Sequence, residues 1–166
     1  MSGYIQAMRA LVGRRPILQC GASVLVRNAK GELLLQQRMD NGLWGYHGGS
    51  VELDERVEDA ARRELLEETG LTAKRMTLLG VFSGPELHYI YPNGDEVSNI
   101  DIVFLCDDYT GEITRQPDEV RALRWFAPGE LPPFSQITPP NRAPLRAYLS
   151  GLEERNGGAV EQQARG

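Results

Sequence analysis

The chain has 166 residues, of which 41% are hydrophobic and 25% are charged. This length suits one domain with a substantial core and is short for two. The formal net charge of −5 argues against a general nucleic-acid-binding surface, because phosphate backbones attract an excess of lysine and arginine.

The hydrophobic runs are too short to cross a membrane. None approaches the roughly 20 apolar residues that a spanning helix needs, and the N-terminus lacks the long apolar core of a secretion signal. We therefore expect a cytoplasmic protein with no membrane partner.

The first segment predicts an amphipathic helix over residues 2–13. Its apolar residues recur at helical spacing: Tyr4, Ile5, Met8, Leu11 and Val12. Ser2 and Gly13 are suitable caps for its two ends. We expect residues 1–16 to be an appendage that packs on the domain or on a partner subunit, which makes a homodimer a candidate assembly.

Two strands and a glycine-rich loop follow. Residues 17–26 and 32–37 flank the turn-forming sequence Asn-Ala-Lys-Gly and predict a hairpin. Residues 40–49 contain too many glycines for regular structure and lead the chain into a helix. Glycines at this point would let the backbone approach a metal ion or a phosphate closely.

The helix that follows breaks the usual hydrophobic pattern. At 3.6 residues per turn, one apolar stripe comprises Val57, Ala60, Ala61 and Leu65. Glu64 and Glu68 fall inside this stripe and Glu67 lies at its margin, which brings like charges together. The alternative is a solvated acidic face paired with Arg62 and Arg63. Three hard oxygen donors close to one another suit Mg²⁺, with Mn²⁺ as a substitute.

The remainder of the chain predicts four more strands and a second helix. The strands are expected at residues 74–83, 87–91, 96–106 and 122–126. Residues 128–144 contain six prolines and predict an irregular surface segment. A closing helix is expected at 144–152, which completes a domain over 17–152. The polar tail, residues 153–166, is expected to be disordered. Hairpins on either side of one long helix favour an α+β or α/β/α architecture.

The stretch Gly49–Leu71 carries a longer pattern, Gly-x5-Glu-x7-Arg-Glu-U-x-Glu-Glu-x-Gly-U with U aliphatic. This stretch resembles the Nudix box of the Nudix hydrolases, with every defined position filled. The resemblance extends over roughly Leu18–Leu149. It implies the Nudix-type α/β/α sandwich with a mixed β-sheet.

The resemblance also implies roles for individual residues. Glu64, Glu67 and Glu68 would hold the divalent cation, with the carbonyl of Gly48 as a further ligand. The residues that would support the site are Arg63, which orients a metal ligand, Glu55, which holds the arginine, and the structural glycines Gly49 and Gly70.

A general base must accept a proton from the attacking water. Two carboxylates are candidates, Glu64 in the box and Glu119 in the loop before the last strand. The predicted catalytic residues are therefore Glu64, Glu67, Glu119 and Arg63. Glu119 could equally be an ordinary charged loop residue.

Two positions depart from the commoner family pattern. His47 stands where the family often has proline, and its imidazole could shuttle a proton, contact substrate or only fill space. Asp54 stands where glycine is common and is a candidate helix N-cap. Tyr46, His88 and Tyr89, with His47, are candidate substrate-binding residues, although aromatic residues in strands often only pack against the sheet.

The activity that the resemblance implies is metal-dependent hydrolysis of a pyrophosphate bond in a nucleoside diphosphate linked to another moiety. ADP-ribose, nucleotide sugars and dinucleotides are the favoured substrates. Hydrolysis of nucleoside triphosphates is the alternative, and a domain that senses a nucleotide without cleaving it is a third reading. The three box glutamates disfavour that third reading, because a sensing domain would be expected to have lost them.

Overall fold

In a computed structural model, the backbone is described for residues 3–164 and the side chains as far as Glu154. These residues form three α-helices and eight strands. Their bounds are α1 Tyr4–Val12, β1 Ile17–Arg27, β2 Leu33–Arg38, β3 Trp44–Gly45, β4 His47–Ser50, α2 Val57–Thr69, β5 Thr72–Phe82, β6 His88–Ile90, β7 Glu96–Thr110, β8 Val120–Phe126 and α3 Pro139–Ala164.

The strands form one mixed sheet with β1 at its centre. β1 runs parallel to β7 and antiparallel to β2 and β4. β5 and β6 extend the sheet from β7, whereas β3 and β8 extend it from β2. The predicted hairpin of β1 and β2 is confirmed.

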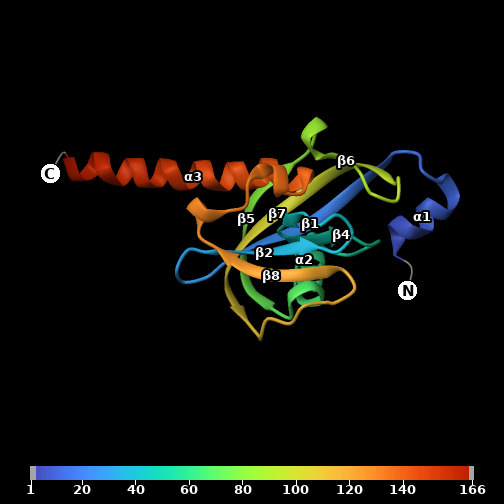
Figure 1. Ribbon diagram of the computed structural model, residues 1–166, viewed down its shortest axis with the longest axis horizontal. Coiled ribbons are helices and arrows are strands. Elements are labelled where there is room, and N and C mark those ends of the chain that lie inside the picture. The colour runs from blue at the N-terminus through green and yellow to red at the C-terminus, as the bar shows by residue number, and fades with distance from the viewer. Residues whose placement is uncertain (1–2, 165–166) are drawn as a thin grey trace.

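Helices cover both faces of this sheet (Figure 1). Under α2 the core contains buried residues of β1 and β2 and the α2 residues Ala60, Ala61 and Leu65. A second core on the opposite face includes Tyr46, Leu145 and Tyr148 and lies under α3. The expected α/β/α sandwich with a mixed sheet is confirmed.

The glycine-rich segment is more regular than its composition predicted. β4 pairs with β1 in antiparallel register from Gly21↔Ser50 to Val24↔His47. Gly48 faces Ser23 so closely that a Cβ at position 48 would collide with the backbone of β1. Because glycine has no Cβ, this segment can hydrogen-bond as a strand where a larger residue would be excluded.

Asp54 does not cap α2. The residue preceding the helix is Arg56, and it makes no capping hydrogen bond through its side chain. Asp54 instead has φ = 60° and is the one non-glycine residue with positive φ in the described part of the chain. This left-handed conformation is the one that glycine adopts without strain. The helix ends as predicted, at the left-handed Gly70.

The C-terminal helix is longer than expected. α3 begins at Pro139 and contains Pro144, so the irregular segment ends earlier than predicted. Pro139 and Pro140 lie in the first helical turn, where a missing N–H would have no intrahelical partner, whereas Pro144 lies inside the helix. The backbone remains helical through Ala164, where a disordered tail was expected, and residues 165 and 166 lie outside the described residues.

The predicted N-terminal helix is present as α1, which lies at the opposite end of the molecule from the C-terminus (Figure 1). None of its side chains is fully buried. Its preceding residue is Gly3, and the predicted cap Ser2 lies outside the described residues. No helix among the described residues is long and apolar enough to span a bilayer.

Candidate active site

The glycine strand β4 lies directly against the acidic side of α2. A Cβ at position 49 would lie 2.5 Å from the Glu64 carboxyl carbon, so only glycine leaves room for this carboxylate. One residue earlier, the Gly48 N–H donates to Glu68 Oε2 at 3.1 Å. Gly49 of the box and the preceding Gly48 thus contact Glu64 and Glu68 of α2.

Arg63 connects the carboxylates of the box. Its Nε and Nη2 donate to the two oxygens of Glu55 at 2.8 and 3.0 Å. Its Nη1 donates to Glu64 at 2.7 Å and lies 3.7 Å from Glu67. Glu55 also accepts the backbone N–H of Glu52 at 2.9 Å. One guanidinium therefore fixes the loop before α2 and the Glu64 side chain together.

Glu68 is held from the side of the sheet. Its Oε2 accepts from Gln36 Nε2 at 3.1 Å and lies 3.7 Å from His47 Nδ1. His47 is fully buried, and its Nε2 lies 3.1 Å from the Leu34 carbonyl oxygen. The imidazole therefore lies on the buried side of the Glu68 carboxylate.

A cleft of about 720 Å³ opens over these carboxylates. Glu64, Glu67 and Glu68 line it from α2, and Glu119 lines it from the loop before β8. Burial raises the pKa of Glu119, and the neighbouring Glu68 adds to the shift. Residues far apart in sequence therefore contribute carboxylates to one cavity.

The surroundings of Glu64 disfavour its charged form. Burial raises its pKa from 4.5 to about 7. The hydrogen bond from Arg63 opposes this shift, whereas the charges of Glu68 and Glu67 reinforce it. A site that accumulates negative charge in this way favours a bound cation.

The donor set fits a divalent cation in kind, since carboxylate and carbonyl oxygens are the ligands of Mg²⁺. The side chains do not yet converge: within residues 3–154, no three His, Cys, Asp or Glu side chains are grouped closely enough to hold an ion. Glu67 is half exposed and is directed towards Arg63. Coordination by all three glutamates would require the Glu67 side chain to turn away from Arg63.

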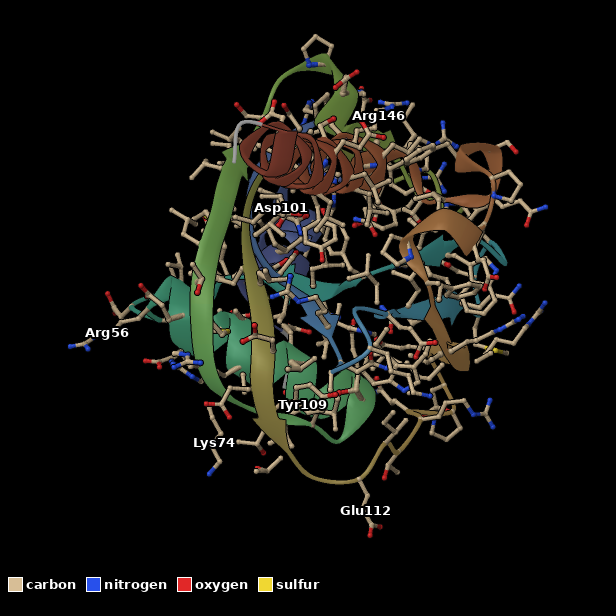
Figure 2. All side chains as sticks on the ribbon, turned by 90° about the vertical axis from the view of Figure 1, so that its left-hand side faces the viewer. Arg56, Lys74, Asp101, Tyr109, Glu112 and Arg146 are labelled. Atoms are coloured by element: carbon tan, nitrogen blue, oxygen red, sulfur yellow. The ribbon has the colours of Figure 1, made fainter. Side chains whose placement is uncertain are left out.

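A second cavity of about 100 Å³ adjoins the cleft and shares Gly48 and Gly49 with it. At its base Asp101 accepts from Ser23 Oγ at 2.7 Å and from the Tyr46 hydroxyl at 2.9 Å. Figure 2 shows Asp101 inside the molecule beneath α3. Burial raises the pKa of this carboxyl, and the two hydrogen bonds partly oppose the shift.

Two buried polar atoms in the lining of this second cavity have no hydrogen-bond partner among the described residues. They are Gln36 Oε1 and Thr138 Oγ1. Since buried polar groups are nearly always paired, these atoms are suited to contact a polar ligand.

The predicted substrate-binding residues lie in different places. Tyr46 and Tyr89 line the second cavity. His88 lies 2.9 Å from Glu96, and neither cavity has it in its lining. His47 is likewise absent from both linings and has no exposed surface.

Sequence reasoning missed Asp101 and the contribution of α1. A charged residue between Ile100 and Ile102, in a largely apolar strand, was a usable signal for Asp101. Gly3, Ile5, Gln6 and Arg9 line the large cleft. No local pattern indicated that this helix would lie beside the carboxylates.

Comparisons with known proteins identify the family of the chain. The NUDIX domain family model matches residues 18–148. A putative 8-oxo-dGTP diphosphatase of Bacillus subtilis is 32% identical over 82% of this chain and 83% of its own length. An ADP-ribose pyrophosphatase of Methanocaldococcus jannaschii is 38% identical over 61% of this chain, which spans 57% of that protein.

Among solved structures, the fold is similar to that of a MutT NUDIX hydrolase from Burkholderia pseudomallei. The TM-score is 0.66 with 32% identity, and the match covers 80% of this chain and 98% of the other. The complete box, the sandwich around it and these similarities lead to one conclusion: the chain belongs to the Nudix family of hydrolases, enzymes that cleave phosphorus anhydrides.

Proposed function

We propose that this enzyme hydrolyses a pyrophosphate bond in a nucleoside diphosphate linked to another moiety X, using Mg²⁺ or Mn²⁺. The observation that carries the proposal is the meeting of two cavities at Gly48 and Gly49. The smaller has unpaired neutral polar atoms and suits a nucleobase. The larger carries the carboxylates and has room for the pyrophosphate and for X.

Glu64, Glu67 and Glu68 would hold the cation, with the carbonyl of Gly48 as an additional donor. When bound, the cation neutralises charge on the non-bridging phosphate oxygens and on the leaving group. Arg63 keeps Glu64 in place, and Glu55 keeps Arg63 in place through two hydrogen bonds. These contacts preorganise the site before substrate arrives.

In the reaction, a water oxygen forms a bond to one phosphorus while the bridging P–O bond breaks. The water proton passes to a carboxylate and the leaving phosphate keeps the electron pair. We assign the base to Glu119, because it enters the cleft from a different element than the three box glutamates. Glu64 is already engaged with Arg63.

A second candidate is hydrolysis of nucleoside triphosphates. The specific support is the similarity to the putative 8-oxo-dGTP diphosphatase, which extends over most of both chains. The similarity to an ADP-ribose pyrophosphatase supports the first candidate but covers less of that protein. A sensing domain without activity is disfavoured, because the chain retains all three box glutamates.

The test is a substrate panel of ADP-ribose, diadenosine polyphosphates, nucleotide sugars and nucleoside triphosphates. Each compound is incubated with Mg²⁺, Mn²⁺ or EDTA, and the products are identified by chromatography. We expect metal-dependent release of a nucleoside monophosphate from at least one X-linked diphosphate. Cleavage of triphosphates alone would support the second candidate, and no cleavage of any compound would support the sensing domain.

A further inference from the structure

α1 is held beside the active-site cleft by polar contacts at both ends. At its start, the Tyr4 N–H donates to Glu52 Oε2 at 2.8 Å. Near its end, Arg9 donates to the carbonyl of Arg15 at 2.7 Å, to that of Gly13 at 3.1 Å and to that of Glu96. Since no α1 side chain is fully buried, these contacts determine the position of the helix more than core packing does.

The contacts with Glu52 and Glu96 join α1 to two other segments that contribute residues to the cleft lining. Glu52 belongs to the loop between β4 and α2, where its own backbone N–H donates to Glu55. Glu96 begins β7 at the β6–β7 turn. The helix therefore bridges the box loop and this turn, and Gly3, Ile5, Gln6 and Arg9 complete the wall of the cleft there.

The chemistry of this wall differs from that of the metal-binding side. Beside α1 the lining includes the amide of Gln6, the carboxylates of Glu52 and Asp95, which contact α1, and the amide of Asn93, which donates to Asp95. Arg9 is occupied by backbone carbonyls and lies 3.8 Å from Asp95. Amides both donate and accept hydrogen bonds, which suits hydroxyl groups, whereas the carboxylates repel a further phosphate.

We propose that α1 forms the subsite for X and that this subsite selects an uncharged, hydroxyl-bearing group such as a sugar. Gln6 contacts that group directly. Glu52 is a positioning residue, which acts by holding the start of α1. This inference rests on the proposed function, because X exists only in a substrate of that class.

The test compares ADP-ribose with ATP, two compounds that share adenosine and differ beyond the second phosphate. In Gln6→Ala we expect the KM for ADP-ribose to rise about 5- to 10-fold, the effect of one lost hydrogen bond. The kcat for ADP-ribose and the KM for ATP stay unchanged. Ala7→Ser, an exposed α1 position that does not line the cleft, is the matched control and behaves like the native chain.

Glu52→Ala should raise the KM for ADP-ribose as Gln6→Ala does, by releasing the start of α1, and should lower the KM for ATP, because a carboxylate that repels phosphate is lost. Glu52→Gln restores the acceptor and most of the affinity for ADP-ribose. A second readout is hydrogen exchange in EDTA, in which ADP-ribose should slow exchange of the α1 amides and ATP should not. Unchanged KM values in both variants, or equal rises for both substrates, would overturn the subsite.

Failure of the subsite and failure of the proposed function give different results. If the native chain cleaves ADP-ribose and Gln6→Ala matches it, only the subsite is wrong. If the native chain cleaves no X-linked diphosphate, the proposed function is wrong. If ADP-ribose also fails to slow hydrogen exchange of the α1 amides, the subsite is wrong as well.

Discussion

Arg63 and Glu55 form a two-point ion pair, with Nε–Oε1 and Nη2–Oε2 distances of 2.8 and 3.0 Å. Glu55 precedes α2 and Arg63 lies within it, so this pair joins the loop to the helix. The same guanidinium reaches Glu64. The proximity of Glu55 and Glu64 raises the pKa of Arg63, and Arg63 in turn lowers the pKa of Glu55.

This arrangement predicts that Glu55→Gln impairs turnover although residue 55 does not contact the substrate. The variant side chain has one acceptor oxygen for the two Arg63 donors, Nε and Nη2. Arg63 is then less firmly positioned and holds Glu64 less firmly. We expect kcat to fall about 10- to 100-fold, as for other residues that support metal ligands, with a smaller change in KM. Steady-state kinetics measure this, with Glu58→Gln on the exposed first turn of α2 as control. Full activity of Glu55→Gln would contradict the assignment.

Asp54→Gly should stabilise the fold. Asp54 has φ = 60°, a conformation that costs a side-chain-bearing residue about 1 kcal/mol or more. Glycine removes this strain but adds freedom to the unfolded chain, so the net gain in the free energy of unfolding is about 0.5 kcal/mol. Asp54→Ala keeps the strain and should be no more stable than the native chain. Urea denaturation measures the free energy of unfolding of each variant. If Asp54→Gly is less stable than the native chain, the backbone at Asp54 is not strained.

The buried carboxyl of Asp101 should make the stability difference between the native chain and Asp101→Asn depend on pH. Burial raises its native pKa above the unfolded value of about 3.9, so folding favours the protonated carboxyl. This contribution is complete below the unfolded pKa and is lost as the pH rises through the native pKa. Relative to Asp101→Asn, the native chain should therefore lose stability upward from about pH 4 and level off above its native pKa.

Parallel urea titrations of the native chain and Asp101→Asn across this range measure the difference. Asparagine does not titrate, so other ionisable groups cancel in the comparison. The difference in free energy of unfolding could instead stay constant, or grow in favour of the native chain with rising pH. Either result would show that the surroundings do not disfavour the charged form of the carboxyl.

Glu119→Gln separates proton transfer from metal binding. If Glu119 is the base, kcat falls by about 10²- to 10⁴-fold while the affinity for Mn²⁺ is unchanged. Calorimetric titration with Mn²⁺ gives the affinity, and Asp118→Asn, the neighbouring cleft residue, is the matched control. A loss below tenfold in Glu119→Gln would move the role of base to Glu64.

Much of the site could be predicted because its residues are close in sequence. The helical period placed Glu64 and Glu68 on the inward stripe, and the structure confirms that Glu68 is buried beside Leu65. The approach of Gly49 to Glu64 follows the box as well. The periodicity of a single helix is sufficient to place Glu64 and Glu68 on one side of α2, whereas the approach of Gly49 to Glu64 also requires β4 to lie against α2.

Other features depend on distant parts of the chain and left little local signal. Asp101 contacts Ser23 because β7 lies beside β1 in parallel register, and it contacts Tyr46 because β4, which Tyr46 precedes, also pairs with β1. The strand at His47–Ser50 was hidden because glycine composition predicts a loop unless a neighbouring strand supplies partners. The early start of α3 at Pro139 was missed because proline discourages helix prediction even where a first turn tolerates it.

The most direct test of the metal-dependent site is Glu68→Gln, assayed with Mg²⁺ on whichever substrate the native chain cleaves best. The amide keeps the size of the side chain and an acceptor for Gln36 and Gly48, but it removes the charge available to a cation. We predict a loss in kcat of about 100-fold or more, together with weaker Mn²⁺ binding. Turnover and Mn²⁺ affinity equal to those of the native chain would contradict the assignment of this cleft as the catalytic centre.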